Sequence, residues 1–202
     1  DKLETIREIN YDNGYAICFE EILKNLDLLT PQNEHIGLAL RTQVKMYPEI
    51  ALRELIANAM IHQDFTIGGT SILIELFSNR IEISNPGTPL ISIDRLIDHN
   101  PISRNEKLAS IMRRFKICEE KGSGIDKVIK SIEIFQLPAP NFLEYDNGTK
   151  VIIYSYKKLN EMDRDDKLRA CYQHAFLQYV SGEKMTNESL RVRFNIEKKN
   201  AA

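Results

Sequence analysis

Two β-hairpin patterns, separated in the chain by helical sequence, constrain the fold more than any other feature. Each pattern consists of two short β-prone runs joined by turn residues, and the runs span residues 71–77, 80–84, 142–146 and 150–156. The second turn contains Asn147-Gly148, a pair that accepts the positive φ values of tight hairpin turns. Strands joined in this way pair antiparallel, so the sequence predicts a sheet that is mostly antiparallel.

Helical periodicity occupies most of the remaining chain. Apolar residues recur at helical spacing in the segments 16–29, 49–63, 105–116, 125–136, 166–180 and 186–194. Near-alternating apolar residues predict one more strand over 36–45. We therefore expect an α+β fold. In it, a two-layer sandwich has helices on one face of a mixed, mostly antiparallel sheet, and a short, truncated helical segment follows at the C-terminus.

Composition places few demands on this fold. With 202 residues and 43% hydrophobic content, the chain can bury a core without disulfides or metal ions. The three cysteines have no metal-binding spacing and favour a reducing cytoplasm. No apolar run approaches the roughly 20 residues of a membrane helix, so no membrane contact is expected. The formal net charge of -2 argues against a chain that binds nucleic acid throughout.

A change of composition near residue 157 suggests a domain boundary. Residues 157–165 are charged and lack an apolar period, and the segment that follows is richer in basic residues. We expect a domain over 1–156, a linker over 157–165 and a small helical segment over 166–202. The chain starts at Asp1 rather than Met, and we expect it to be a piece of a longer protein, cut at both ends.

Helix 49–63 carries the first group of chemically suggestive residues. Glu54 and Asn58 lie four residues apart, so their side chains are neighbours on one face of the helix. A carboxylate beside a carboxamide can orient a water molecule and hold a hard cation, because Mg²⁺ prefers a few protein oxygens together with phosphate oxygens. His62, a further four residues along, could reach a phosphate or a water. The alternative for Glu54 and Asn58 is a solvated helix face, and for His62 it is a residue at the helix C-terminus favoured by the dipole.

Two glycine-containing segments could bring backbone close to a ligand. Strand 80–84 runs into Asn85-Pro86-Gly87, and Gly122-Ser123-Gly124 precedes a helix with Lys121 just before it. Unpaired amides at a helix N-terminus form an anion site, and the adjacent lysine adds positive charge. An ordinary loop and a glycine helix start are the corresponding structural alternatives.

The order of these motifs resembles the GHKL ATPase (Bergerat) fold. One branch is more similar: a family of bacterial transcriptional regulators, related to the C-terminal part of ATP-dependent DNA helicases of the RecG type. The resemblance rests on ALRELIANAMIHQDF, RIEISNPG, SRNEKLASIMRRF and EEKGSGIDKVIK. It covers residues 15–156 well, and residues 163–202 resemble the first helices of a winged helix. Family members commonly carry an AlbA/schlafen-like domain before the GHKL-like domain and a winged helix after it.

The resemblance implies a nucleotide site that holds ATP and Mg²⁺. It gives Glu54 the role of general base, Asn58 that of Mg²⁺ ligand and Asn85 that of adenine contact. Gly87 would allow close approach of the ligand. Gly122 and Gly124 would be phosphate-loop positions, and Arg104 and Asn105 would lie in the lid. Lys121 and Ser123, beside these glycines, are further candidates for binding the nucleotide. Most GHKL ATPases have Asp where this chain has Asn85, and an Asn can accept a hydrogen bond there but carries no charge.

Three functional hypotheses follow. The first is an ATP-Mg-binding regulatory domain of a transcriptional regulator that binds DNA through the full-length parent protein. The second is a degenerate module that binds no nucleotide and serves as a dimerisation scaffold, which Asn85 favours. The third is an active, weak ATPase, which Glu54 permits. A helicase motor is not expected, because the chain has no GxxxxGK[ST] loop.

Overall fold

The computed structural model describes residues 6–30, 32–36, 41–97, 100, 102–118 and 124–196, with the backbone alone for 32–36 and 41–44. Its helices are α1 (Tyr15–Leu29), α2 (Glu49–His62), the short 3₁₀ helix η1 (Ile93–Arg95), α3 (Glu106–Arg114), α4 (Gly124–Ile134), α5 (Arg164–Val180) and α6 (Asn187–Arg193). Its strands are β1 (Gln32–Ile36), β2 (Arg41–Lys45), β3 (Leu73–Leu76), β4 (Arg80–Pro86), β5 (Asn141–Tyr145) and β6 (Gly148–Tyr154).

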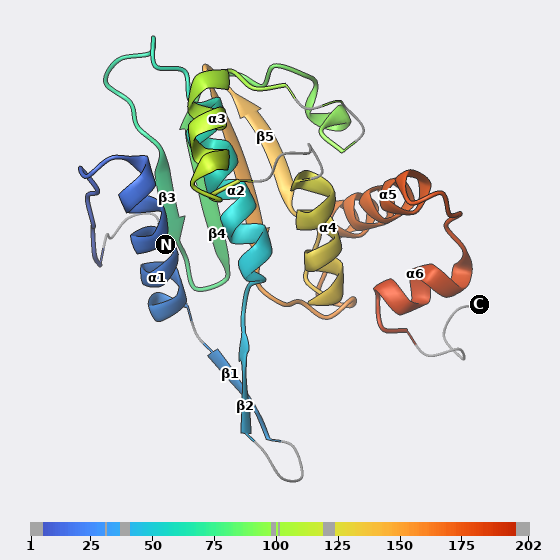
Figure 1. Cartoon of the computed structure of the whole chain (residues 1–202). Coiled ribbons are helices and arrows are strands. Elements are labelled where there is room, and N and C mark those ends of the chain that lie inside the picture. The colour runs from blue at the N-terminus through green and yellow to red at the C-terminus, as the bar shows by residue number, and fades with distance from the viewer. Residues whose placement is uncertain are drawn as a thin grey trace.

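A four-stranded antiparallel sheet in the order β3-β4-β6-β5 forms one layer, and helices cover it (Figure 1). Both predicted hairpins are present, and the return of the chain places β6 beside β4 at the centre. Helices α2, α3 and α4 lie together on one side of the sheet. The predicted α+β sandwich with helices on one face is therefore confirmed.

The core forms where α2 crosses the sheet. Ile81 and Ile83 of β4 and Val151 and Ile153 of β6 are buried at alternate positions, as expected for one face of a pleated strand. They belong to the same apolar cluster as Ile56 and the other buried residues of α2. Helix α2 contacts α1, α3, α4 and β4, and this central position buries it on several sides.

The segment predicted as a single strand over 36–45 is organised differently. Strand β2 lies within this segment, whereas β1 ends at its first residue, Ile36, and the two strands pair with each other in a separate two-stranded sheet. This hairpin projects from the body of the protein (Figure 1). Residues 37–40 lie outside the described residues. We expected a mixed sheet, but all pairings among the described strands are antiparallel. The strand predicted in this segment pairs with its neighbour in the chain and does not join the main sheet.

The β5–β6 turn also departs from its prediction. Tyr145 pairs with Gly148, so the two-residue loop is Asp146-Asn147 and the glycine already belongs to β6. The positive φ, 40°, falls on Asp146. An Asp tolerates this left-handed region better than most residues, which makes the shifted turn accessible.

The C-terminal helices dock onto the sheet domain through polar contacts with one short segment. Arg193 of α6 donates to the carbonyl of Leu137 at 2.8 Å, and Arg169 and Gln173 of α5 donate to Ala139 and Pro140 at 3.1 and 2.9 Å. Buried carbonyls need such partners, so each contact fixes the orientation of a helix. The helix pair is therefore held in a specific position.

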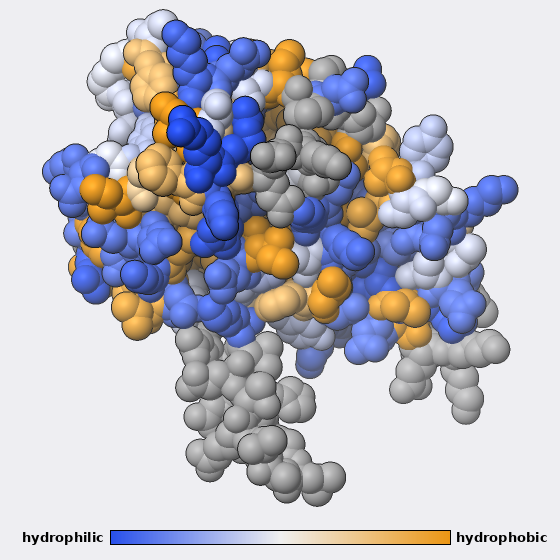
Figure 2. Space-filling model, viewed as in Figure 1, coloured by the Kyte–Doolittle hydropathy of each residue, from blue (hydrophilic) through white to orange (hydrophobic). Residues whose placement is uncertain are grey.

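Three further features concern membrane-spanning helices, cysteines and the surface. No described helix is long and apolar enough to cross a membrane. Cys18, Cys118 and Cys171 are free thiols. On the face seen in Figure 2, exposed apolar side chains form small groups among hydrophilic ones. Such scattered groups are ordinary on a protein surface and do not by themselves mark an interface.

Candidate functional site

A polar stripe runs along α2 at intervals of one helical turn. Glu54, Asn58 and His62 are all half-buried, whereas the residues of α2 that face the core are fully buried. The carboxamide of Asn58 donates from Nδ2 to Glu54 Oε1 at 3.2 Å. The predicted neighbour relation between these two side chains is therefore present, and the bond orients the carboxamide with its nitrogen toward the carboxylate.

The N-terminus of α4 packs directly against this stripe. Gly124 is the first residue of α4, and a Cβ atom added there would overlap the carboxyl group of Glu54 and lie 2.9 Å from its Cγ. Any larger residue at this position would require the Glu54 side chain to move. The amides of a helix N-terminus favour a negative charge beside them, so a carboxylate at this position is electrostatically reasonable. Lys121, Gly122 and Ser123 lie outside the described residues.

The end of β4 is joined to the end of α2 by backbone contacts. The amide of Asp64 donates to the carbonyl of Pro86 at 2.8 Å. Gly87 has a φ of 115°, and a Cβ there would lie 3.1 Å from Asp64 Cβ and 3.2 Å from the His62 carbonyl oxygen. Gly87 thus permits both an unusual backbone conformation and a close approach, but the close neighbour is α2 itself.

Asn85 directly precedes Pro86 at the end of β4 and is 7% exposed. Its Nδ2 donates to the carbonyl of Pro86 at 3.3 Å. A carbonyl oxygen can only accept, so this contact requires the amide nitrogen on that side and leaves Oδ1 as the acceptor on the other. Thr149 of β6 faces Asn85 across the sheet and donates from its hydroxyl to the carbonyl of Gly87 at 2.7 Å.

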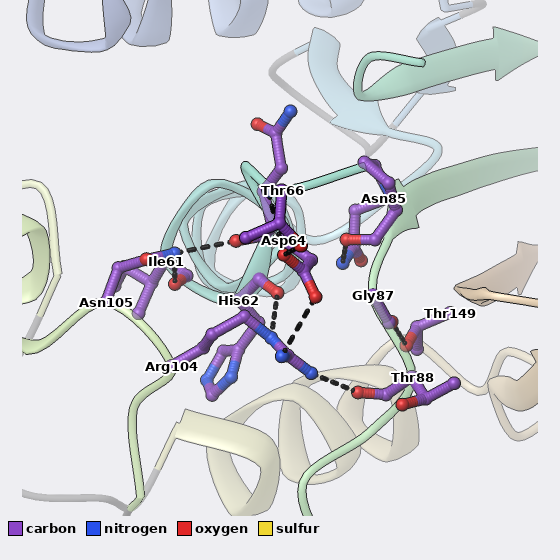
Figure 3. A network of polar contacts seen from close by, with 12 residues as sticks. Ile61, His62, Asp64, Thr66, Asn85, Gly87, Thr88, Arg104, Asn105 and Thr149 are labelled. Carbon is purple, nitrogen blue, oxygen red and sulfur yellow. Dashed lines mark hydrogen bonds and ion pairs between the residues drawn. The ribbon is translucent and has the colours of Figure 1, made fainter. Parts of the chain in front are cut away.

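Arg104 ties the loop after β4 to the end of α2 (Figure 3). Its guanidinium donates to the carbonyl of His62 at 3.1 Å and to that of Thr88 at 2.7 Å. It also pairs with the carboxylate of Asp64, with 3.3 Å between Nη1 and Oδ2. A cation at this place suits the negative end of the α2 dipole.

Asn105 completes the cap of α2. Its Nδ2 donates to the carbonyls of Ile61 and Gln63 at 2.8 and 2.7 Å. Together with Arg104 it satisfies three consecutive carbonyls that the helix leaves unpaired. Both residues are therefore engaged in holding the end of α2. Their predicted place in a lid over a ligand stays a prediction.

The sequence reasoning gave no role to Asp64, which the structure places at the centre of this network. Its Oδ1 accepts from the amide and the hydroxyl of Thr66 at 2.9 and 2.6 Å. These bonds, with a smaller contribution from Arg104, lower the pKa of Asp64. The signal available in the sequence was Asp64-Phe65-Thr66, since an Asp two residues before a Thr commonly closes an Asx turn.

The surroundings of His62 favour its neutral form. Burial lowers the pKa of the imidazole, and the nearby charge of Arg104 lowers it further. The described residues contain no group of three or more His, Cys, Asp or Glu side chains suited to a metal ion. A cation at Asn58 would therefore need oxygens from another source, such as a phosphate.

An open cavity lies beside the Arg104 network. It has a volume of about 540 Å³ and is lined by Phe65 and residues 103–108. Its wall includes Arg104 and Asn105, but Glu54, Asn58 and Asn85 do not line it. The cavity therefore borders the candidate site at the start of α3 and does not coincide with the Glu54–Gly124 contact.

Residues 69–153 match the model of a protein family described as "Putative ATP-dependent DNA helicase recG C-terminal". The match covers less than half of the chain. It includes Asn85, Gly87 and Gly124, whereas α2 with Glu54 and Asn58 lies before it. The finding supports an ATPase-like domain, of a nucleotide-binding type, in this part of the chain.

A comparison with solved structures shows the fold more broadly. The DIP2311 protein from Corynebacterium diphtheriae superposes with a TM-score of 0.64 at 17% identity. The alignment covers 91% of this chain and 39% of that protein, so the chain spans about two fifths of its length. At this identity the likeness concerns the fold alone. No curated protein matches the chain significantly.

Replacement of Gly124 by Ala tests the contact between α4 and α2. The added methyl group must displace the Glu54 side chain, and overpacking of this kind costs about 1–3 kcal/mol. We expect Gly124→Ala to lower the free energy of unfolding in urea by about that amount. In a Glu54→Ala background the same change is expected to be close to neutral, because the overlapping group is gone. An equal loss in both backgrounds would contradict the contact.

The lowered pKa of His62 predicts a pH dependence of stability. Because the unfolded chain binds a proton near pH 6.5 and the folded protein only at lower pH, the contribution of His62 is complete above about pH 6.5 and is lost as the pH falls toward the folded pKa. We expect His62→Gln to reduce the loss of stability between about pH 7.5 and 5.5, measured by urea unfolding. An NMR titration in which His62 titrates at or above its ordinary value would refute this account.

Proposed function

We propose that this chain is a regulatory domain that binds ATP with Mg²⁺ and belongs to a DNA-binding transcriptional regulator. The ligand would lie against the polar stripe of α2, between the end of β4 and the N-terminus of α4. The helicase-related family description of residues 69–153 is consistent with such a domain. The proposal includes the GHKL-type assignment of the fold and a cytoplasmic location, which the three free thiols support.

The single observation that carries the proposal is the packing of Gly124 on Glu54. Two residues 70 positions apart in the chain meet there. One is the carboxylate of the Glu54–Asn58 motif, and the other is the glycine that begins the helix after the Gly122–Gly124 motif. A helix N-terminus can bind phosphate oxygens through its free amides. A chance pair of weak motifs has no reason to converge in this way.

The chemistry of the residues fits a magnesium-bound triphosphate. Because the nitrogen of the Asn58 carboxamide donates to Glu54, its oxygen is on the opposite side of the group and can serve as a hard ligand. The ion would neutralise phosphate charge next to Glu54. In this arrangement Asn58 would orient the phosphates, and Glu54 would polarise a water molecule near the terminal phosphate.

The orientation of Asn85 supports adenine as the base. With Nδ2 committed to the Pro86 carbonyl, Oδ1 remains as an acceptor. This is the hydrogen-bonding capacity that a carboxylate would offer to the amino group of adenine. The substitution of Asn for Asp therefore retains an acceptor and removes a charge, so we expect weaker binding than a carboxylate would give.

One observation favours the alternative of a scaffold that binds no nucleotide. The side chains of Arg104 and Asn105 are already bonded to backbone carbonyls of α2 and of the loop. In a degenerate domain these bonds would fix the loop permanently, and the module would serve dimerisation. In the nucleotide-binding case the loop would have to change some of them when it closes over a ligand.

Titration calorimetry with ATP and a non-hydrolysable analogue, each with Mg²⁺, tests the proposal. We expect the wild type to bind both ligands. Asn58→Ala should weaken binding by about tenfold or more, since loss of one ligand of a charged group costs more than about 1.4 kcal/mol. Asn160→Ala, which removes an exposed carboxamide in a turn, is the matched control and should bind like the wild type.

The outcomes separate the hypotheses. Absence of binding at millimolar ligand would overturn the nucleotide-binding proposal and favour the scaffold. Binding together with phosphate release that is lost in Glu54→Gln would show an ATPase. Binding without phosphate release is the result that a regulatory domain predicts.

A further inference from the structure

One carboxylate at the C-terminal end of α4 contacts both α5 and α6. Glu133 of α4 lies 3.0 and 3.1 Å from Nδ1 of His174 on α5. The same carboxylate lies 3.2 Å from Nε of Arg193 on α6. The other ring nitrogen of His174 lies 3.0 Å from the hydroxyl of Ser189 on α6. Glu133, His174 and Arg193 therefore join three helices.

This cluster is buried, so its partners depend on one another. His174 is 4% exposed and Arg193 is 3% exposed. A buried cation that loses its carboxylate partner is strongly disfavoured, because the charge remains out of water without compensation. A change in the position of Glu133 is therefore costly unless His174 and Arg193 follow it.

The segment that follows α4 adds to the same attachment. Leu137 is 2% exposed, and its carbonyl accepts from Nη2 of Arg193 at 2.8 Å. Arg193 thus contacts both the last turn of α4 and the chain that leaves it. These contacts add to those of Arg169 and Gln173 with Ala139 and Pro140, so α4 and the segment after it hold both helices of the pair.

Helix α4 is suited to transmit a displacement from one end to the other. It has 11 residues, which corresponds to a length of roughly 16 Å. Val128, Ile129 and Ile132 along its length are almost fully buried. If a helix of this length shifts as a rigid body, a movement at Gly124 is carried to Glu133.

From this arrangement we propose that α4 couples the candidate nucleotide site to the docking of α5 and α6 through Glu133, His174 and Arg193. The inference rests on the proposed function, since it requires a ligand at the Gly124 end. A triphosphate there brings negative charge beside Glu54 and the first amides of α4, and so changes the forces on that helix end. The response at the other end is an altered position of the helix pair, which is the part of the chain that resembles a DNA-binding element.

Hydrogen exchange of the α5 and α6 amides, with and without saturating ATP and Mg²⁺, tests this coupling. We expect the ligand to change exchange in these helices by about fivefold or more in the wild type, the lower end of ordinary coupling between two sites. Glu133→Gln keeps the size of the side chain but removes the charge, and should abolish the response. Glu144→Gln, an exposed carboxylate on β5, is the matched control and should respond like the wild type.

Reciprocity gives a second readout. If ligand binding alters docking, then loss of docking must alter ligand affinity by the same factor. Glu133→Gln is therefore expected to change the Kd for ATP by the factor seen in exchange, although Glu133 lies at the far end of α4. If circular dichroism shows that this variant does not fold, His174→Gln replaces it in the same exchange experiment. The coupling then predicts a response in the wild type that His174→Gln loses.

The result that overturns the coupling is distinct from failure of the proposed function. ATP binding to the wild type with unchanged exchange in α5 and α6, or an unchanged response in a folded Glu133→Gln, would overturn the coupling and leave nucleotide binding intact. No binding of ATP to the wild type at millimolar concentration would overturn both.

Discussion

The contact between the first residue of α4 and the Glu54 side chain sets the geometry on which the other features depend. The backbone of Gly124 lies so close to the Glu54 carboxyl group that a Cβ there would overlap it. This fixes the start of α4 over the polar stripe of α2, and the buried face of α4 then fixes its far end. The same packing that closes the core therefore leaves a carboxylate, a carboxamide and a helix N-terminus side by side, a combination suited to phosphate and a hard cation.

A second constraint acts at the other end of α2. Its last carbonyls are satisfied by Arg104 and Asn105, and the chain that follows is bonded to the end of β4 through Asp64 and Pro86. The carbonyls and the amide named here all have partners, which is what makes a polar junction compatible with a core. It also means that any loop closure over a ligand must exchange existing bonds for new ones, so that binding and loop position are energetically linked.

Much of this could be predicted from the sequence because it depends on local pattern. The helix of Glu54 and Asn58 was predicted to within one residue at its end, since helical spacing and Pro48 define it locally. Only the resemblance to a known fold indicated that the segments of Gly124 and Glu54 lie at one site, because no local pattern encodes a contact between distant segments. The capping role of Arg104 could not be predicted, since a charged residue in a loop has many partners of similar energy. The pairing of the segment 36–45 as a separate hairpin was missed because alternation specifies a strand but not its neighbour.

The most direct test of the central claim is an NMR titration of the labelled protein with ATP and Mg²⁺, followed at the backbone amides of Gly87 and Gly124 and the side-chain amides of Asn58 and Asn85. These groups come from three separate segments that we assign to one site. We predict that their resonances shift together and saturate with a single Kd. Resonances that stay unchanged, or shifts confined to one segment or to another part of the protein, would contradict the claim that the three motifs form one nucleotide site.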